Sequence, residues 1–287
     1  EPFMSIVNTL PLESNKQIKI NFNGGDLSSD AGLLLIKEFA CKLGFEKILK
    51  SEFKTNDTAT FRTHKDDENL WQMVYQIFGA YFADDCADEL TNDPVLTAIL
   101  GKKALASQPT LSRFFNRMDD TTLRQFYDIM RKFRKIVYAI QRPQLLLLDL
   151  DSTLLDTFGH QEDAGYNFHY RNHGYHPLVC YDGMTGDLLK IELRNGTVYS
   201  STGVTDFLQP LLDEFLTDYA DIPLLLRGDS GFATPALYRQ CETNGISYVI
   251  RMKENQVLRN LASFIEDELN EKTKLDQKSW LLKNQWR

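Results

Sequence analysis

Residues 144–155, QLLLLDLDSTLL, are the stretch of sequence that decides how this chain folds. The unbroken apolar run at its start is typical of a strand that is buried on both faces. Asp149 and Asp151 lie two residues apart, so the pleat of a strand places their side chains on the same face. The stretch therefore predicts a central strand that carries carboxylates toward one edge of a sheet.

Four more apolar runs follow this strand, over residues 175–181, 188–193, 222–226 and 246–250. The turn sequence DGMTGD joins the first two of these runs, which predicts an antiparallel hairpin. Apolar residues at helical spacing predict helices over 205–219 and 234–244. Three strands followed by helix, strand, helix and strand predict a mixed α/β sheet, as in the ribonuclease-H-like fold.

The part of the chain before Pro143 is predicted to be mainly helical. The expected elements are a short strand over 17–22 and helices over 28–44, 66–83, 109–118 and 121–140. Ser28 or Ser29 is expected to cap the first helix, and Gly44 to end it. We therefore expect a helical domain over 1–140 and an α/β core over 141–287. The short helix, turn and basic helix of 109–140 fit either a DNA-reading pair or an ordinary helical hairpin.

Charge is unevenly distributed along the 287 residues, whose net charge is −8. Residues 101–142 hold ten basic and three acidic side chains, a net charge of +7. A basic segment in an acidic protein is the pattern expected of a surface that binds DNA phosphates. The alternative is a solvated helix face whose acidic partners lie elsewhere in the fold. The candidate DNA-binding residues are Arg113, Arg117, Arg124, Arg131, Lys132, Arg134 and Lys135.

Cysteine and hydropathy patterns bear on the compartment. Four widely spaced cysteines without a CxxC pair argue against a zinc site or a disulfide framework, and they favour a reducing cytosol. No apolar run approaches the roughly 20 residues that cross a bilayer. The first ten residues, EPFMSIVNTL, lack the pattern of a signal peptide. We therefore expect a cytoplasmic protein without a membrane partner.

A second acidic site follows the fourth predicted strand, in LLLRGDSGF at residues 224–232. Asp229 in this stretch and Asp151 in the first are expected at neighbouring strand ends, where ligands collect in open α/β sheets. Carboxylates delivered there can hold Mg²⁺, and two such ions can promote cleavage of a phosphodiester. The structural alternative is that each aspartate only forms a turn or caps a helix.

LLLLDLDSTLL also fits the opening motif of haloacid-dehalogenase-like phosphatases. In that alternative Asp149 would accept the phosphoryl group and Asp151 would be the general acid and base. Ser230 and Lys253 would then hold phosphate. The alternative leaves the upstream sequence blocks unexplained.

Two further groups of residues are weighed as ligands. His169, His173 and His176 are spaced for metal binding on a helix, but Gly174 and Pro177 interrupt one, which favours a loop that enters a strand. Arg227 and Arg251 flank the strand ends near Asp229, where they could contact phosphate or form structural ion pairs.

Several blocks resemble the group 1 DDE transposases of bacterial insertion sequences. The resemblance covers about residues 18–255 and is carried by FNGGDLSSDAGLLL, LASQPTLSRFFNRM, LDLDSTLLDTFG, YNFHYRNHGYHPLVCYDGMTGDLL, RNGTVYSSTG and LLRGDSGFATPALYRQCETNGISYVIRMKEN. It implies a ribonuclease-H-like core, two Mg²⁺ or Mn²⁺ ions, and cleavage and joining of DNA strands. By this resemblance Asp151 is the first catalytic and metal-binding acid and Asp229 the second. The implied partner is double-stranded DNA, both transposon ends and target, bound by a homodimer beside the bacterial nucleoid.

The sequence departs from the family pattern at the third acid, a glutamate on a helix after the fifth strand and an inserted domain. The segment after that strand predicts an amphipathic helix, and we assign neither Glu266 nor Glu268 as the missing acid. The residues expected to face inward on this helix are Leu258, Leu261, Phe264, Ile265 and Leu269. We expect the third acid beyond Arg287, so that the core is incomplete and the fragment alone is inactive. The alternative function is a DNA-binding remnant of a transposase without catalysis.

Overall fold

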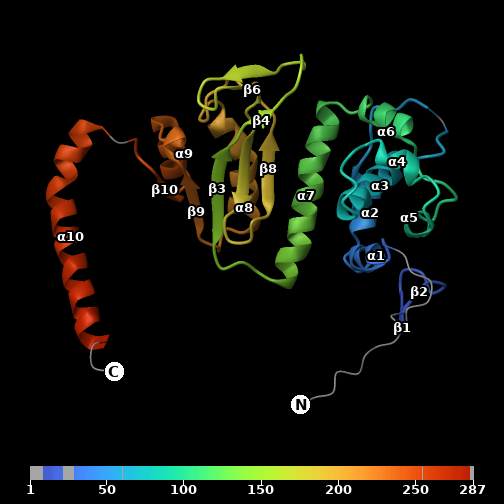
Figure 1. Cartoon of the computed structure of the whole chain (residues 1–287), viewed down its shortest axis with the longest axis horizontal. Helices are drawn as coiled ribbons and strands as arrows, with labels where there is room; N and C mark the ends of the chain where they lie inside the picture. Colours follow the sequence, from blue (N-terminus) through green and yellow to red (C-terminus); the bar gives the residue numbers. More distant parts are fainter. Residues whose placement is uncertain (1–8, 22–28, 60, 254, 285–287) are drawn as a thin grey trace. The chain divides into compact units, whose positions relative to one another are not determined.

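The computed structural model describes residues 9–21, 29–59, 61–253 and 255–284 (Figure 1). The chain divides into two compact units, residues 1–142 and 143–287. Each unit is described by itself below.

The first unit is mainly helical. Its elements are β1 (Thr9–Pro11), β2 (Lys19–Asn21), α1 (Leu33–Lys42), α2 (Phe45–Glu52), α3 (Asp66–Phe78), α4 (Cys86–Glu89), α5 (Pro94–Leu100), α6 (Gln108–Phe115) and α7 (Asp120–Ile140). The strands β1 and β2 pair as an antiparallel hairpin. Tyr75, Phe53 and Phe114 are fully buried and form the centre of the core between the helices. The expected helices over 66–83, 109–118 and 121–140 are confirmed with shifted ends.

The start of α1 differs from the prediction. The helix begins at Leu33, with Gly32 at the N-cap position, so Ser29 does not cap it; Ser28 lies outside the described residues. The physical reason is a backbone turn in which the amide of Leu33 donates to the carbonyl of Asp30, at 2.9 Å. Gly44 separates α1 from α2 with a φ of +72°, a conformation that favours glycine.

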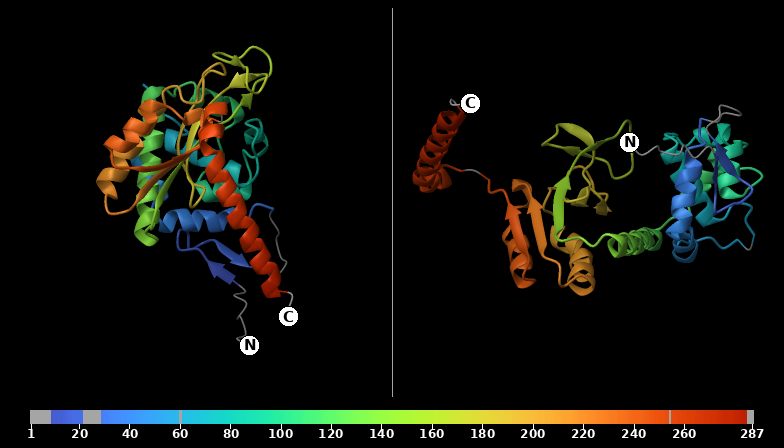
Figure 2. Two further views of the ribbon diagram at one scale, coloured as in Figure 1. Left: turned by 90° about the vertical axis from the view of Figure 1, so that its left-hand side faces the viewer. Right: turned by 90° about the horizontal axis from the view of Figure 1, so that it is seen from below.

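The second unit contains the predicted mixed sheet. Its strands are β3 (Leu146–Ser152), β7 (Leu178–Asp182), β8 (Leu188–Glu192), β9 (Leu224–Gly228) and β10 (Ser247–Ile250), in the spatial order β10-β9-β3-β7-β8. The pairs β3–β9 and β9–β10 are parallel, whereas β3–β7 and β7–β8 are antiparallel. This order and these directions confirm the ribonuclease-H-like fold (Figures 1 and 2).

Two helices pack against this sheet as the sequence predicts. They are α8 (Val204–Asp218), which contacts β8, and α9 (Pro235–Thr243), which contacts β10, and the two helices lie side by side. The apolar face of α8 is buried through Phe207, Leu211 and Phe215. Thr234 caps α9 by accepting a hydrogen bond from the amide of Leu237. The leucines of β3, the central strand, are buried, as the apolar run at residues 144–150 predicts.

A small second sheet replaces the loop expected around the histidines. Its strands are β4 (Leu155–Asp156), β5 (Gly165–Asn167) and β6 (Asn172–Tyr175), in the order β4-β6-β5. The prediction of a loop over this segment is wrong because the strands have only two to four residues and lack an apolar alternation that periodicity can detect. Gly196, in the loop after β8, approaches this sheet closely, since an added Cβ there would meet the backbone carbonyls of Gly165 and Gly174.

Apolar periodicity predicts the faces of two helices less well. In α10 (Gln256–Asn284), Leu261, Ile265 and Leu269 are exposed, so the expectation that they face inward is wrong. In α7, the apolar residues Leu123 and Ile140 are exposed as well. Periodicity shows which residues share a face, but it does not show whether another element covers that face. In the described part of the chain, no helix is both long and apolar enough to cross a membrane.

Gly174→Ala is expected to destabilise the second unit. An added Cβ would meet the backbone carbonyl of Leu155 on the neighbouring strand, and backbone cannot move aside as a flexible side chain can. We expect the free energy of unfolding to fall by about 1–3 kcal/mol, measured by urea titration with circular dichroism. Gly32→Ala is the control, because its added methyl meets open space. A Gly174→Ala variant as stable as the control would contradict the close approach.

Candidate active site

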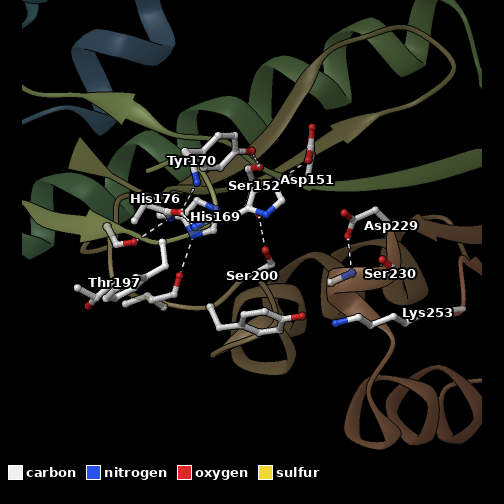
Figure 3. A pocket seen from close by; sticks show the side chains of 16 residues that line it. Asp151, Ser152, His169, Tyr170, His176, Thr197, Ser200, Asp229, Ser230 and Lys253 are labelled. Carbon is white, nitrogen blue, oxygen red and sulfur yellow. Dashed lines mark hydrogen bonds between the residues drawn. The ribbon is translucent and has the colours of Figure 1, made fainter. Parts of the chain in front are cut away.

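The parallel pairing of β3 with β9 brings Asp151 and Asp229 together. The last residue pair in their register is Leu150 with Gly228, and each aspartate is the next residue along its chain. Both side chains line a cavity of about 500 Å³ (Figure 3). The expectation that the two strands lie side by side is confirmed, and it places two carboxylates at the same level of the sheet edge.

Short hydrogen bonds hold each of the two carboxylates. Asp151 Oδ1 accepts from the amide of Ser152 at 2.7 Å, and Asp229 Oδ1 accepts from the amide of Gly231 at 2.8 Å. The second bond begins the short 3₁₀ helix Ser230–Phe232 (η1). A Cβ at Gly231 would lie 3.0 Å from Asp229 Oδ1, so glycine leaves the carboxylate room. Among the residues that the structure describes, the second carboxylate oxygen of Asp151 and that of Asp229 accept no hydrogen bond.

Asp149 shares a strand face with Asp151 but has a different environment. Arg227, its partner in the β3–β9 register, donates to both of its carboxylate oxygens, at 2.8 and 2.5 Å. The hydrogen bonds that Arg227 donates to Asp149 raise the pKa of Arg227. Asp149 is not among the residues that line the cavity. The structural ion pair expected as an alternative for Arg227 is therefore confirmed. It links β3 to β9 two residues before Asp151 and Asp229.

The opposite wall of the cavity comes from the small sheet and the loop at 195–203. Arg194 orders this loop by donating to the carbonyls of His176, Ser200 and Thr202, at 3.0, 3.2 and 2.8 Å. Burial lowers the pKa of Arg194. Asn167, which is buried, donates to the carbonyl of Gly196 at 2.9 Å. The hydroxyl of Ser152 on β3 donates to the Ser200 hydroxyl at 2.9 Å, so the loop is tied to the strand that carries Asp151.

The three histidines do not come together around one point. His176 is buried and its Nδ1 lies 2.7 Å from the carbonyl of Val198, whereas His173 contacts the ring of Tyr166 and His169 the ring of Tyr170. Among the described residues, no group of three or more His, Cys, Asp or Glu side chains is placed to hold a metal ion. The pair Asp151 and Asp229 nevertheless fits Mg²⁺, which takes one or two carboxylates and keeps several waters.

Some of the candidate DNA-binding residues of the first unit are exposed, and others form ion pairs with acidic side chains or are buried. Arg113 and Arg124 are exposed. Arg117 bonds Asp66 at 2.9 Å and lies 3.6 Å from Asp57, and Lys132 pairs with Glu52 at 2.5 Å. Of the remaining candidates, Arg134 is buried, Arg131 is half-buried and Lys135 is exposed.

A comparison with protein-family models finds one that covers nearly the whole chain. The family is described as transposase DDE domain group 1, and the match runs over residues 10–287. The chain belongs to this DDE transposase family. The resemblance inferred from the sequence blocks is thereby confirmed at the level of the family. The phosphatase alternative is wrong, and its proposed nucleophile Asp149 is held by Arg227.

A comparison of this DDE transposase domain with solved structures finds transposases. The catalytic domain of Mos1 mariner transposase shares 10% identity, with 57% of this chain and 82% of that chain covered and a TM-score of 0.29. A piggyBac transposase in a synaptic complex with hairpin DNA shares 13% identity, with 79% and 44% covered and a TM-score of 0.31. The chain thus spans less than half the length of the second protein. A comparison with curated proteins finds no match.

Sequence reasoning located the two aspartates but missed the residues that build the opposite wall. Asn167, Arg194 and Ser200 act through hydrogen bonds between segments that are separated along the chain. These residues lie in the blocks YNFHYRNHGYHP and RNGTVYSSTG. Neither block has the apolar periodicity of a helix or a strand, so the sequence did not indicate that they build this wall. Lys253, just beyond β10, also lines the cavity of the transposase domain.

Acid is expected to destabilise the helical unit through Asp66. Burial alone would raise the pKa of this carboxyl, but hydrogen bonds from Thr55 and Arg117 outweigh it and hold the pKa below its usual value. A lowered folded-state pKa means that ionised Asp66 stabilises the protein above the unfolded pKa of about 4, and this contribution is lost as the pH falls toward the folded value.

The Asp66→Asn variant tests this dependence by urea titration between neutral pH and pH 3. We expect it to lower the free energy of unfolding at pH 7 by about 1.5 kcal/mol, the cost of losing a hydrogen bond to a charged group. Its stability should then fall less than that of wild type as acid is added. Asp85→Asn, at an exposed aspartate, is the control. An acid dependence equal to that of wild type would exclude Asp66 as the cause.

Proposed function

We propose that this chain supplies Asp151 and Asp229 as catalytic metal ligands to a transposase that cleaves DNA and transfers strands, with divalent metal, during transposition of an insertion sequence. The observation that carries the proposal is the placement of these two carboxylates at adjacent strand ends, on the wall of one cavity. Membership of the DDE transposase family supports DNA as the substrate.

Each residue of the site has a defined part in this proposal. Asp151 and Asp229 would share divalent ions, which lower the pKa of an attacking water or 3′-hydroxyl and offset the charge that develops on the phosphate. The amides of Ser152 and Gly231 orient the two carboxylates before any ligand arrives. Lys253 lines the same cavity and can pair with a phosphate oxygen as a point charge.

The proposed ions are Mg²⁺ or Mn²⁺, two in the complete catalytic assembly. In this chain alone we expect loose metal binding and no strand transfer, because two carboxylates bind such ions more weakly than a fuller ligand set does. The neighbouring structures include Mos1 complexes with Mn and with Mg. The proposed partner is double-stranded DNA, held by a homodimer in the bacterial cytoplasm, with the helical region over 1–140 as its DNA-binding part.

Metal is expected to stabilise the second unit through Asp151 and Asp229. Two carboxylates at one strand edge repel each other, and a cation between them removes that repulsion. Millimolar Mn²⁺ should raise the melting temperature of the wild-type chain, because a ligand that binds only the folded state stabilises it. Asp151→Ala and Asp229→Ala should each lose most of this increase in a thermal scan.

Asp213→Ala is the matched control, since Asp213 is an exposed carboxylate of α8 that lies outside the cavity. It should respond to Mn²⁺ as wild type does. If all four proteins respond equally, the shared metal site is wrong and the alternative of a non-catalytic DNA-binding protein is favoured.

Arg113 and Arg117 are expected to affect DNA binding differently. Arg113 is exposed, so Arg113→Gln should weaken binding to duplex DNA and lower the slope of log affinity against log salt by about 1. Arg117 is held by Asp66 and Asp57, so Arg117→Gln should mainly lower the melting temperature. Fluorescence anisotropy at several salt concentrations measures the first effect. Salt-independent binding by the wild-type chain would contradict a phosphate-binding surface.

A further inference from the structure

Large aromatic side chains stand exposed on the cavity wall that faces the two aspartates. Phe168 is 82% exposed, Tyr199 61% and Tyr170 44%, and all three line the cavity with Asp151 and Asp229. Apolar rings at a protein surface are ordinary when scattered, but a group of them inside one polar cavity marks a binding site.

Hydrogen bonds order the backbone segment that carries Phe168 and Tyr170. Asn167 Oδ1 accepts from the amides of His169 and Tyr170, at 2.9 and 3.1 Å, which fixes the turn between β5 and β6. The Tyr170 hydroxyl donates to the carbonyl of Ser152 at 3.3 Å. The ring of Phe168 meets that of Tyr166 edge to face, with centroids 5.2 Å apart. The wall is therefore preorganised, and a ligand that stacks on it orders little protein.

The charges around the cavity restrict what can stack there. Asp151 and Asp229 repel anions, whereas an uncharged planar ring meets no such repulsion. Lys253 lines the same cavity and the exposed Arg171 lies in the turn between β5 and β6, so cations flank the rings. The hydroxyls of Ser200 and Thr197 lie in the lining and can bond polar ring edges (Figure 3). A cavity of about 500 Å³ has room for a nucleotide but not for a duplex.

We propose that Phe168, Tyr170 and Tyr199 form a stacking site for unpaired nucleobases of the DNA strand whose backbone passes Asp151 and Asp229. The proposal rests on the function proposed above and adds a single-stranded substrate segment to it. Aromatic rings bind bases of any sequence through their faces, and each stacked base contributes substantially to affinity for single strands. The site would favour DNA whose end is unpaired over a fully paired end.

The test compares two DNA probes with the full chain. One is a blunt duplex, and the other is the same duplex with a short 3′ single-stranded overhang, both measured by fluorescence anisotropy at one salt concentration without divalent metal. We expect wild type to bind the overhang probe about tenfold more tightly than the blunt one. The double variant Phe168→Ala/Tyr199→Ala should lose this preference and bind the blunt duplex as wild type does.

Phe158→Ala is the matched control. Phe158 is an equally exposed aromatic residue shortly after β4, and it is not among the residues that line the cavity. Its variant should keep the preference for the overhang, and so should Phe168→Trp/Tyr199→Phe, which retains both rings. A 5-iodouracil in the overhang should cross-link under light to a peptide that contains residue 168, 170 or 199.

Two results would overturn the stacking site. One is equal affinity of wild type for the two probes, and the other is an equal loss of preference in Phe158→Ala and in the double variant. Failure of the proposed function is read separately, from the Mn²⁺ response of Asp151→Ala and Asp229→Ala. Equal affinity of wild type for the two probes, together with a normal Mn²⁺ response of wild type, would overturn the stacking site alone.

Discussion

The parallel pairing of β3 with β9 is the contact on which the candidate site depends. It aligns Leu150 with Gly228, so the next residue of each strand is an aspartate at the same sheet edge. The buried leucines on either side of Asp149 favour this register, because a slip of one residue would place the Asp149 carboxylate where a leucine is buried. The ion pair between Asp149 and Arg227 joins the same two strands two residues before Asp151 and Asp229. Packing therefore fixes the separation of the two carboxylates before any metal is present.

The second wall of the cavity is built by a different principle. Its strands have too few residues to bury an apolar face. Gly174 and Gly196 let backbone approach backbone closely, and buried polar side chains bond the segments to one another. Asn167 and Arg194 satisfy backbone groups of loops that have no regular structure of their own. This wall can therefore be ordered and still expose large aromatic rings.

Electrostatics in the helical unit shows why a count of basic residues overstates a binding surface. The positive charge of residues 101–142 is dense in sequence, yet Arg117 and Lys132 pair with Asp66 and Glu52, which lie far earlier in the chain. Arg113 and Arg124 are exposed instead. The proposed interaction with DNA phosphates consequently rests on fewer side chains than the sequence suggests.

The sequence by itself determined the order of strands and helices along the chain and the position of the two aspartates at strand ends. These features follow from apolar runs and local turn signals. It also identified the family through long blocks around Asp151 and Asp229. Tertiary structure alone decided the small sheet, the pairing of Asp149 with Arg227, the exposed face of α10 and the aromatic wall at Phe168 and Tyr199. Each of these depends on contacts between distant segments, and local periodicity carries no information about which segments meet.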